Sequence, residues 1–312
     1  MSGAGPRVTL LDAGPQTTIQ DLGRPGQLRY GIPPSGPMDR RSFVLANRLA
    51  GNADGAAALE CTLVGPRFVV DAPCAVAVTG ASAPVTINGR EAARWTTLPL
   101  RAGDEMRVGQ ATAGVRGYVA FAGGIDAPLV LGSRATYLRG RMGGLQGRAL
   151  RKQDVLRVFP APPVAVRAAA ASLPSPDGDV VVRVVMGPQA DRFTEEGITT
   201  FLSSAYEIVP QSDRMGARLR GPHIAHAHGH DIISDGIALG SVQVPGDGQP
   251  IILLVDRQST GGYTKIATVG SFDIDRVGQL RPGARVRFQA VTLAEAHRMR
   301  REHEGALNAL LT

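Results

Sequence analysis

The sequence predicts a mainly β protein with two domains and few helices. Its 312 residues include 39 Gly and 22 Pro, whereas aromatic residues make up only 4%. This composition favours many short strands joined by turns. The length suffices for two hydrophobic cores, and a segment rich in Pro, Ala and Ser at 160–179 reads as a linker. We therefore expect an N-terminal domain at 1–165 and a C-terminal domain at 176–312.

Local signals place several elements of the N-terminal half. Val8–Leu11 is typical of an opening strand, and Asp39 is a plausible N-cap for a helix over 40–50 that ends at Gly51. A strand-rich stretch follows. Within it, Asn88-Gly89 predicts a tight hairpin, because both residues accept the positive φ that such turns require.

One pattern recurs in both halves: a turn that starts at Arg, then a strand with Arg just before its last apolar residue. The spacings are unequal, so this is not a short-period repeat. The pattern suggests that one kind of β-turn-β corner is reused in two barrels or sandwiches. Its occurrences are Arg101–Val108, Arg151–Val158 and Arg281–Phe288.

The C-terminal half is expected to begin with a strand at 180–186 and a short helix at 189–197. Two further strands, Ile237–Val244 and Ile251–Val255, enclose turn residues and lead into a polar loop at 256–263. The chain closes with a helix, because Thr292 and Glu295 form a capping box ahead of helically spaced apolar residues.

Charge and cysteine content exclude several classes of protein. The formal charge of +7 comes from scattered arginines without a basic run or an aromatic stripe, which argues against nucleic-acid binding. No apolar run reaches the roughly 18 residues that a membrane span needs, and no signal peptide is recognisable. Cys61 and Cys74 lie in no CxxC motif and are expected to be buried. We expect a cytoplasmic protein that binds no membrane.

The polar loop at 256–263 is a candidate site, because it lies between apolar strands and contains a Gly pair. Arg214 is a second candidate: it either forms a local ion pair or grips a substrate carboxylate. Lys265, one of only two lysines, could contact a carboxylate or biotin, although an outward-facing strand lysine is the plainer interpretation. Such a set suits a small molecule with carbonyl and carboxylate groups.

The histidines at 223, 226, 228 and 230 allow two interpretations. The last three alternate, so a strand would place them on one face and could hold zinc. No cysteine or repeated carboxylate completes a known ligand spacing, and a solvated or interface face remains the alternative. We predict no metal. The chain also lacks a GxSxG elbow, an HExxH motif and a GxxxxGK[ST] phosphate loop, so it shows no ATP site of its own.

A set of ordered segments resembles the family known as allophanate hydrolase subunit 2, which is of the biotin-dependent carboxyltransferase type. The likeness runs from about Thr17 to the C-terminal helix. The segments are TIQDLGRPG, GIPPSGPMD, NRLAGN with ALE shortly after, FAGGID, GGLQGR, SDRMGARL, SDGIALGSVQVPGDGQPI and DRQSTGGYTKIA.

The resemblance implies a fold of two cyclophilin-like β-barrel domains. It also implies that the chain acts as one subunit of a hetero-oligomer. The family's best-defined members are the C-type subunit of ATP-dependent 5-oxoprolinase and half of the carboxyltransferase domain of urea carboxylase. The first implies a hydrolase that cleaves 5-oxo-L-proline, consumes ATP, and works with a B-type subunit (related to allophanate hydrolase subunit 1) and an A-type subunit. Alternatives are a carboxyltransferase that uses biotin on a partner, and a non-catalytic regulatory partner of a kinase-inhibitor subunit.

The resemblance also marks site residues without proving their roles. We expect Arg214 to neutralise a carboxylate or phosphate, and Asp256 to act as base or orienter. Gln243 and Gln258 are expected to orient an amide. Amides of Gly261 and Gly262 would stabilise an oxyanion. Alternatively, Asp213–Arg214 and Asp256–Arg257 are structural pairs. The remaining candidates are substrate-binding residues: Gln243, Thr260, Tyr263, Asp213, Gln20, Asp21, Arg24, Ser35 and Asp39.

Overall fold

A computed structural model describes residues 5–173, 176 and 178–310. The chain divides into two compact units, so each is described by itself. Unit 1 comprises 1–24, 35–175 and 307–312, and unit 2 comprises 25–34 and 176–306. The main division falls close to the predicted linker. Unlike the predicted domains, each unit also takes a short segment from the other end of the chain.

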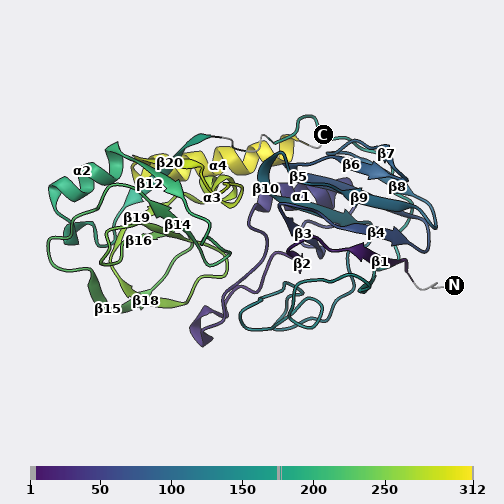
Figure 1. Cartoon of the computed structure of the whole chain (residues 1–312), viewed down its shortest axis with the longest axis horizontal. Coiled ribbons are helices and arrows are strands. Elements are labelled where there is room, and N and C mark those ends of the chain that lie inside the picture. Colours follow the sequence, from purple (N-terminus) through teal and green to yellow (C-terminus); the bar gives the residue numbers. More distant parts are fainter. Residues whose placement is uncertain (1–4, 174–175, 177, 311–312) are drawn as a thin grey trace. The chain divides into compact units, whose positions relative to one another are not determined.

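Unit 1 is built from two antiparallel sheets (Figure 1). The first has the order β11-β1-β4-β9-β6-β7, and the second has the order β2-β3-β10-β5-β8. The strands of the first sheet are β1 Arg7–Asp12, β4 Arg67–Val70, β6 Val85–Ile87, β7 Arg90–Glu91, β9 Glu105–Val108 and β11 Val155–Arg157. Those of the second are β2 Thr17–Gln20, β3 Ala58–Thr62, β5 Cys74–Ser82, β8 Thr97–Leu100 and β10 Ala113–Phe121.

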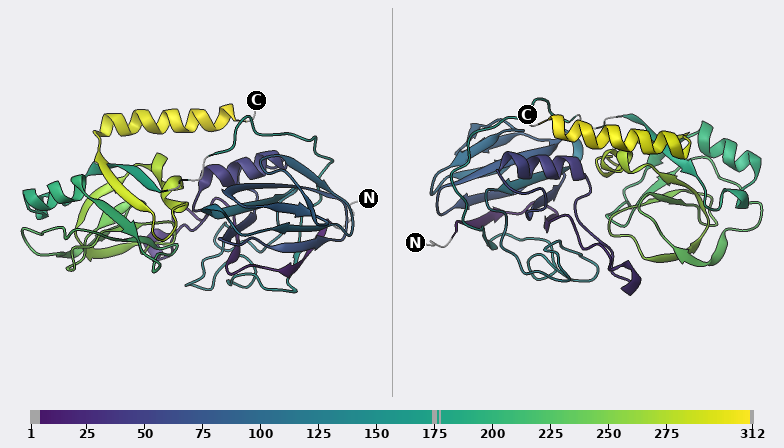
Figure 2. Two further views of the ribbon diagram at one scale, coloured as in Figure 1. Left: turned by 45° about the horizontal axis from the view of Figure 1, so that its top comes forward. Right: turned by 180° about the vertical axis from the view of Figure 1, so that it is seen from behind.

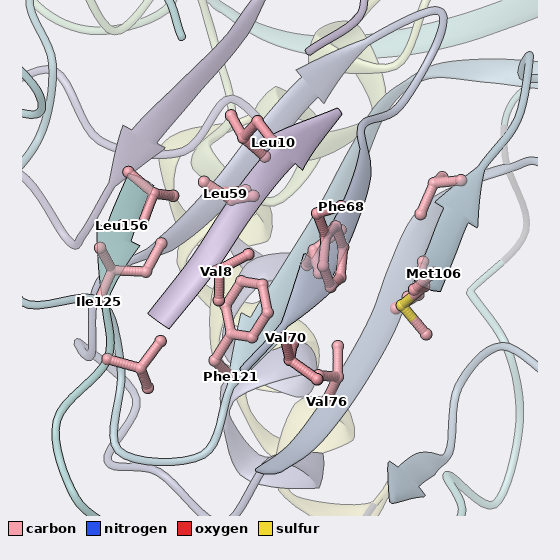
Figure 3. Close-up of a cluster of buried hydrophobic side chains, with 14 of the residues drawn as sticks. Val8, Leu10, Leu59, Phe68, Val70, Val76, Met106, Phe121, Ile125 and Leu156 are labelled. Carbon is pink, nitrogen blue, oxygen red and sulfur yellow. The ribbon is translucent and has the colours of Figure 1, made fainter. Parts of the chain in front are cut away.

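The apolar core of unit 1 lies between these sheets, and Figure 3 shows part of it. Val8 and Leu10 alternate with less buried residues along β1, the pattern of a strand with one buried face. Phe68 of β4 meets Phe121 of β10 edge to face, with ring centroids 5.3 Å apart. Burial of such large side chains supplies most of the stabilisation of a β sandwich.

The helix α1 (Arg40–Leu49) covers the other face of β5 and β10, which explains why these two strands are buried almost throughout. Its predicted N-cap is confirmed: the Asp39 carboxylate accepts a hydrogen bond from the Ser42 backbone N–H at 3.0 Å. The predicted hairpin is also confirmed, since Asn88 and Gly89 have φ of 51° and 77° between β6 and β7.

Unit 2 is a closed barrel of seven strands in the order β12-β19-β16-β17-β14-β13-β20. It is closed by a parallel pairing of β12 with β20, in which Val182 lies opposite Phe288. The prediction of a mainly β protein with few helices is thereby confirmed. Of the two predicted barrels, unit 2 forms a closed one, whereas the strands of unit 1 form two sheets. The strands are β12 Asp179–Met186, β13 Ala205–Ile208, β14 Gly216–Arg220, β16 Ser241–Gln243, β17 Ile251–Leu253, β19 Lys265–Val269 and β20 Arg285–Ala290.

A separate two-stranded ribbon, β15 (Asp231–Gly236) with β18 (Thr260–Tyr263), accompanies the barrel (Figure 1). Two predictions are therefore wrong. The polar loop at 256–263 is a strand in its second half, because its backbone pairs with β15. The strand expected at Ile237–Val244 is confined to β16, and Ile237 itself lies outside any strand.

The recurring Arg pattern does mark equivalent corners, as predicted. In each corner the fourth residue donates its backbone N–H to the carbonyl of the leading Arg, at 3.0, 3.1 and 3.0 Å. The third residue has positive φ, which a turn before a strand often requires. These third residues are Gly103, Gln153 and Gly283, with φ of 86°, 72° and 90°.

Helices complete unit 2 and the C-terminal segment. The helix expected at 189–197 is instead a 3-10 turn, η2 (Ala190–Arg192), followed by α2 (Glu195–Ser203). The helix α3 (Ser271–Gly278) was not predicted. The predicted C-terminal helix is present as α4 (Leu293–Ala309), the long helix in Figure 2, and the Thr292 hydroxyl accepts from the Glu295 N–H at 3.2 Å. A 3-10 turn, η1 (Leu28–Tyr30), lies in the early segment of unit 2.

The predicted linker is partly docked where it is described. The Arg167 carbonyl accepts the backbone N–H of Thr97 in β8 at 2.8 Å, and the Thr97 hydroxyl accepts the Arg167 N–H at 3.0 Å. Residues 174, 175 and 177 of this segment lie outside the described residues. Among the helices of the described ranges, none is both long and apolar enough to cross a membrane.

Candidate functional site

The predicted site residues fall into two groups, one in each unit. Gln20, Asp21, Arg24, Ser35 and Asp39 belong to unit 1. The others belong to unit 2, from Asp213 to Tyr263.

Asp21 organises the long connection after β10. Its carboxylate accepts hydrogen bonds from the Gly23 N–H at 2.8 Å, the Ser133 hydroxyl at 2.5 Å and the Arg134 N–H at 2.5 Å. Ser133 is fully buried, so this carboxylate replaces water for groups that would otherwise be unsatisfied. Nothing in the sequence pattern singled out Ser133, because the contact joins residues far apart in the chain.

Gln20 and Arg24 hold the same connection. The Gln20 amide donates to the Thr136 carbonyl at 3.1 Å and accepts the Gly36 N–H at 3.2 Å. The Arg24 guanidinium donates to the Ala135 carbonyl. These side chains thus join the segments around residues 20, 36 and 135, and this geometry is that of a scaffold for the surrounding loops.

Ser35 has the most unusual environment in unit 1. Its φ is 57°, a left-handed conformation that costs a non-glycine residue on the order of 1–2 kcal/mol. The residue is 5% exposed, and within the described chain its hydroxyl oxygen has no hydrogen-bond partner. Strain together with an unsatisfied buried hydroxyl is typical of functional segments.

Asp39 leads to a buried acidic network that the sequence did not single out. Its backbone N–H donates to the Tyr118 oxygen at 2.8 Å, and Tyr118 donates its hydroxyl proton to Glu60 at 2.8 Å. Glu60 also accepts the Met38 N–H at 2.8 Å. Burial, and next the negative charge of Glu60, raise the pKa of Tyr118 well above its usual range. The one feature of the sequence that could have indicated this network is Glu60, which is part of the ALE segment shared with the family.

In unit 2, Arg214 pairs with Asp256. The Arg214 Nε lies 2.8 Å from Asp256 Oδ2, and the exposed fraction of each side chain is 5%. The Asp213 carboxylate instead accepts the backbone N–H groups of Met215 and Gly216, at 2.8 and 3.2 Å. The expected pairing of neighbours in sequence is therefore replaced by a pairing across two loops. The proposed roles of Arg214 and Asp256 in binding and catalysis remain predictions.

Gln243, Gln258 and Gly261 are brought together. A Cβ built on Gly261 would lie 2.9 Å from the Gln243 amide nitrogen and 3.4 Å from that of Gln258. Glycine at this position therefore lets two carboxamides approach the ribbon strand β18. Gln243 is 1% exposed, and its amide lies 3.4 Å from the Tyr263 carbonyl. Gly262 is half-buried, whereas Thr260 and Tyr263 are exposed.

Lys265 is buried, so its interpretation as an outward strand lysine is wrong. It is 2% exposed and lies directly opposite Gln243 in the pairing of β19 with β16. Opposite residues of an antiparallel pair project to the same face. The Lys265 ammonium lies 3.4 Å from the carboxylate of Asp235 on the ribbon. Lys265 and Asp235 therefore join the carboxamides of Gln243 and Gln258 in one polar cluster.

The histidines do not lie on a strand, so the predicted alternation on one face is wrong. The His226 Nε2 is 3.1 Å from the Val244 carbonyl and 3.2 Å from the Thr264 hydroxyl, and its ring packs on Phe193 with centroids 4.7 Å apart. Burial lowers the pKa of His226 below its ordinary value. Across the described ranges, no three His, Cys, Asp or Glu residues are grouped to hold a metal ion.

Neither cysteine forms a disulfide, and burial makes both thiols poorly reactive. Cys61 is buried, and Cys74 is half-buried. Burial raises the pKa of the Cys61 thiol to about 12 and that of the Cys74 thiol to about 11. Because the thiolate is the nucleophilic form, neither thiol is suited to covalent catalysis near neutral pH.

Comparison with known protein families shows which family the chain belongs to. Residues 30–290 match the family described as "Carboxyltransferase domain, subdomain A and B". The chain belongs to the carboxyltransferase domain family. Membership covers both units, because the matched range extends from the early segment of unit 2 to the last barrel strand.

Individual relatives in this family carry different names. The chain is 35% identical to the C-type subunit of 5-oxoprolinase from Haemophilus influenzae, over 95% of this chain and 95% of that one. It is 33% identical to "Urea amidolyase" of Lachancea kluyveri, over 95% of this chain but 18% of that one. The chain thus spans less than a fifth of the urea amidolyase that it matches.

Solved structures support the same family assignment. The crystal structure of the K. lactis urea amidolyase superposes with a TM-score of 0.93 at 33% identity, covering 99% of this chain and 20% of that one. The carboxyltransferase-domain fold therefore extends through the chain.

Proposed function

We propose that this chain is the C-type subunit of an ATP-dependent 5-oxoprolinase, which opens 5-oxo-L-proline to L-glutamate. One observation carries the proposal. The match to the 5-oxoprolinase relative spans 95% of both chains, so the two correspond almost from end to end. On this proposal the chain acts in the cytoplasm with the B-type and A-type subunits, and ATP is consumed by the assembled complex.

The polar cluster of unit 2 supports this substrate class. 5-Oxoproline carries a lactam amide and a carboxylate. The Gln243 and Gln258 carboxamides can orient an amide through paired N–H and C=O contacts, and the Lys265 ammonium can bind a carboxylate. We assign Arg214 and Asp256 to positioning the loop before Gln258, because each already satisfies the other's charge.

The test is reconstitution of the three subunits with ATP and 5-oxo-L-proline, with release of glutamate as the readout. Omission of this chain from the mixture is the control. We expect glutamate only when all three subunits and ATP are present. An assembled complex that consumes no 5-oxoproline would contradict the proposal.

A second candidate function is carboxyl transfer from biotin to urea or another amide. The TM-score of 0.93 with a urea amidolyase favours it. Its test is the consumption of carboxybiotin on a carrier domain in the presence of urea, followed with and without this chain. If neither assay shows turnover while the chain still binds its partner subunit, a regulatory role without chemistry is favoured.

A further inference from the structure

The Lys265 ammonium is poorly satisfied for a group so deeply buried. Lys265 is 2% exposed, and its Nζ makes no hydrogen bond of good geometry with any described residue. An ammonium carries three donors, and burying them without partners is costly. A bound ligand that supplies hydrogen-bond acceptors would offset this cost.

Its one charged contact among the described residues is with Asp235. The distance of 3.4 Å is long for an ion pair with a hydrogen bond, and the exposed fraction of the Asp235 side chain is 56%. Asp235 belongs to β15, a strand that pairs only with β18 in the described chain and whose pairing is irregular between Asp231 and Asp235. A half-exposed carboxylate on such a ribbon holds the ammonium only weakly.

The side chain of Gln189 also lies beside Lys265. The Lys265 backbone N–H donates to the Gln189 side-chain carbonyl at 3.1 Å, which fixes that carboxamide beside the lysine. The Gln189 side chain also contacts the Asp235 carboxylate. The pKa of Asp235 is lowered, mainly by the hydrogen bond from the Gly236 backbone N–H and next by the charge of Lys265. An ammonium and a carboxamide thus converge on one carboxylate group, a donor set that suits any planar carboxylate.

We propose that Lys265 and Gln189 form the binding site for the carboxylate of a small ligand, and that Asp235 occupies this site until the ligand displaces it. The identification of the ligand as a lactam acid rests on the proposed function. Gln243 lies opposite Lys265 in the sheet register and therefore places its carboxamide next to the bound carboxylate. The ligand class is a small carboxylic acid whose amide lies one or two bonds from the carboxylate.

The experiment measures ligand affinity by calorimetry on the assembled complex, without ATP, so that no turnover is needed. The probes are 5-oxo-L-proline and 2-pyrrolidinone, which is the same lactam without the carboxylate. The variants are Lys265→Met and Asp235→Asn. Their matched controls are Lys152→Met, at the only other lysine, which is exposed, and Asp231→Asn, an exposed aspartate of the same strand.

The Lys265→Met substitution should weaken the binding of 5-oxoproline about 30-fold, because one charge-assisted contact with the carboxylate is lost. Binding of 2-pyrrolidinone should change less than about 3-fold, because it offers no carboxylate. Asp235→Asn should tighten 5-oxoproline binding about 3- to 10-fold, since the competing charge is removed. Both control variants should bind 5-oxoproline like the unmodified complex.

Two results would overturn the proposal: unchanged 5-oxoproline affinity in a folded Lys265→Met complex, or weaker binding in Asp235→Asn. If Lys265→Met does not fold, the Asp235→Asn result alone decides, because that side chain is half-exposed and tolerates replacement. The readout is separate from the proposed activity. Carboxylate-dependent affinity without glutamate release would keep this site and remove the 5-oxoprolinase assignment.

Discussion

The Arg214 guanidinium lies 2.8 Å from the Asp256 carboxylate in unit 2, and both side chains are 5% exposed. The backbones of the two residues are also hydrogen-bonded, since the Asp256 N–H donates to the Arg214 carbonyl at 2.9 Å. The pair therefore joins the turn before β14 to the segment that carries Gln258 toward Gly261. We expect its effect on the polar cluster to be positional, because the charges of the pair satisfy each other.

Removing one partner of this pair should be strongly destabilising. We expect Arg214→Ala to lower the free energy of unfolding by about 3–5 kcal/mol, because Asp256 is left as a buried, uncompensated charge. The measurement is urea denaturation followed by circular dichroism. The matched control is Arg220→Ala, which breaks an exposed pair with Glu207 and should cost no more than about 1 kcal/mol.

The kinetics of a milder variant separate positioning from substrate binding. Arg214→Lys keeps the charge but loses the two-pronged contact, in which Nε and Nη2 of Arg214 donate to the two carboxylate oxygens of Asp256 at 2.8 and 3.4 Å. If Arg214 only positions the segment, kcat should fall while KM for the carboxylate substrate stays near its original value. A large rise in KM with unchanged kcat would instead mean that Arg214 grips the substrate.

Relief of backbone strain at Ser35 should raise stability. Glycine accepts a φ of 57° without steric cost, so Ser35→Gly should gain about 0.5–1 kcal/mol in unfolding free energy despite its greater freedom when unfolded. Ser35→Ala removes the hydroxyl but keeps the strain. Because Ser35→Ala also removes a buried, unsatisfied hydroxyl, the strain is measured by the stability of Ser35→Gly relative to Ser35→Ala, and a glycine variant no more stable than the alanine variant would contradict the strain. Activity lost in both folded variants would show that the hydroxyl itself is needed.

Stability should fall as the pH decreases from about 7.5 through the unfolded pKa of His226, which is about 6.5. The folded pKa of His226 is lowered by burial, with His230 and His223 adding smaller effects, so the unfolded chain binds the proton more tightly. His226 thus contributes stability above its unfolded pKa of about 6.5, and this contribution is lost as pH falls. Melting temperature against pH should flatten in His226→Gln but not in His297→Gln, at an exposed histidine. Equal slopes in all three proteins would contradict this assignment.

Thiol chemistry provides a simple check of the core. With the pKa of Cys61 near 12 and that of Cys74 near 11, neither should react appreciably with a thiol reagent such as DTNB at pH 8 in the folded protein. Both should react on unfolding in urea. Rapid reaction of one thiol in the native state, assigned with Cys74→Ser, would show that its environment is more open than described.

Features governed by neighbouring residues were predictable from the sequence. The N-cap at Asp39, the Asn88-Gly89 hairpin and the Thr292 capping box depend on contacts within a few residues, and all three are present. The recurring corners after Arg101, Arg151 and Arg281 were predictable for the same reason. Local turn and cap chemistry is determined almost entirely by residue type and spacing.

Features governed by distant pairing were not predictable from the sequence. The segment at 260–263 appears polar and loop-like, yet β15 supplies its strand partner. Lys265 looks like a surface residue until its neighbours in the barrel are known. Glu60 and Tyr118 meet only because β3 and β10 are adjacent. Candidate residues could be named from the motifs, but whether each holds a loop or faces a ligand depends on these pairings.

The most direct test of the proposed function is glutamate release from 5-oxo-L-proline by the reconstituted complex, measured with the unmodified chain and with Lys265→Met. We expect ATP-dependent glutamate release from the unmodified complex and a KM raised about 30-fold in the variant. A correctly assembled complex that releases no glutamate, yet passes the carboxyl group of carboxybiotin to urea, would contradict the 5-oxoprolinase assignment and establish the carboxyltransferase function instead.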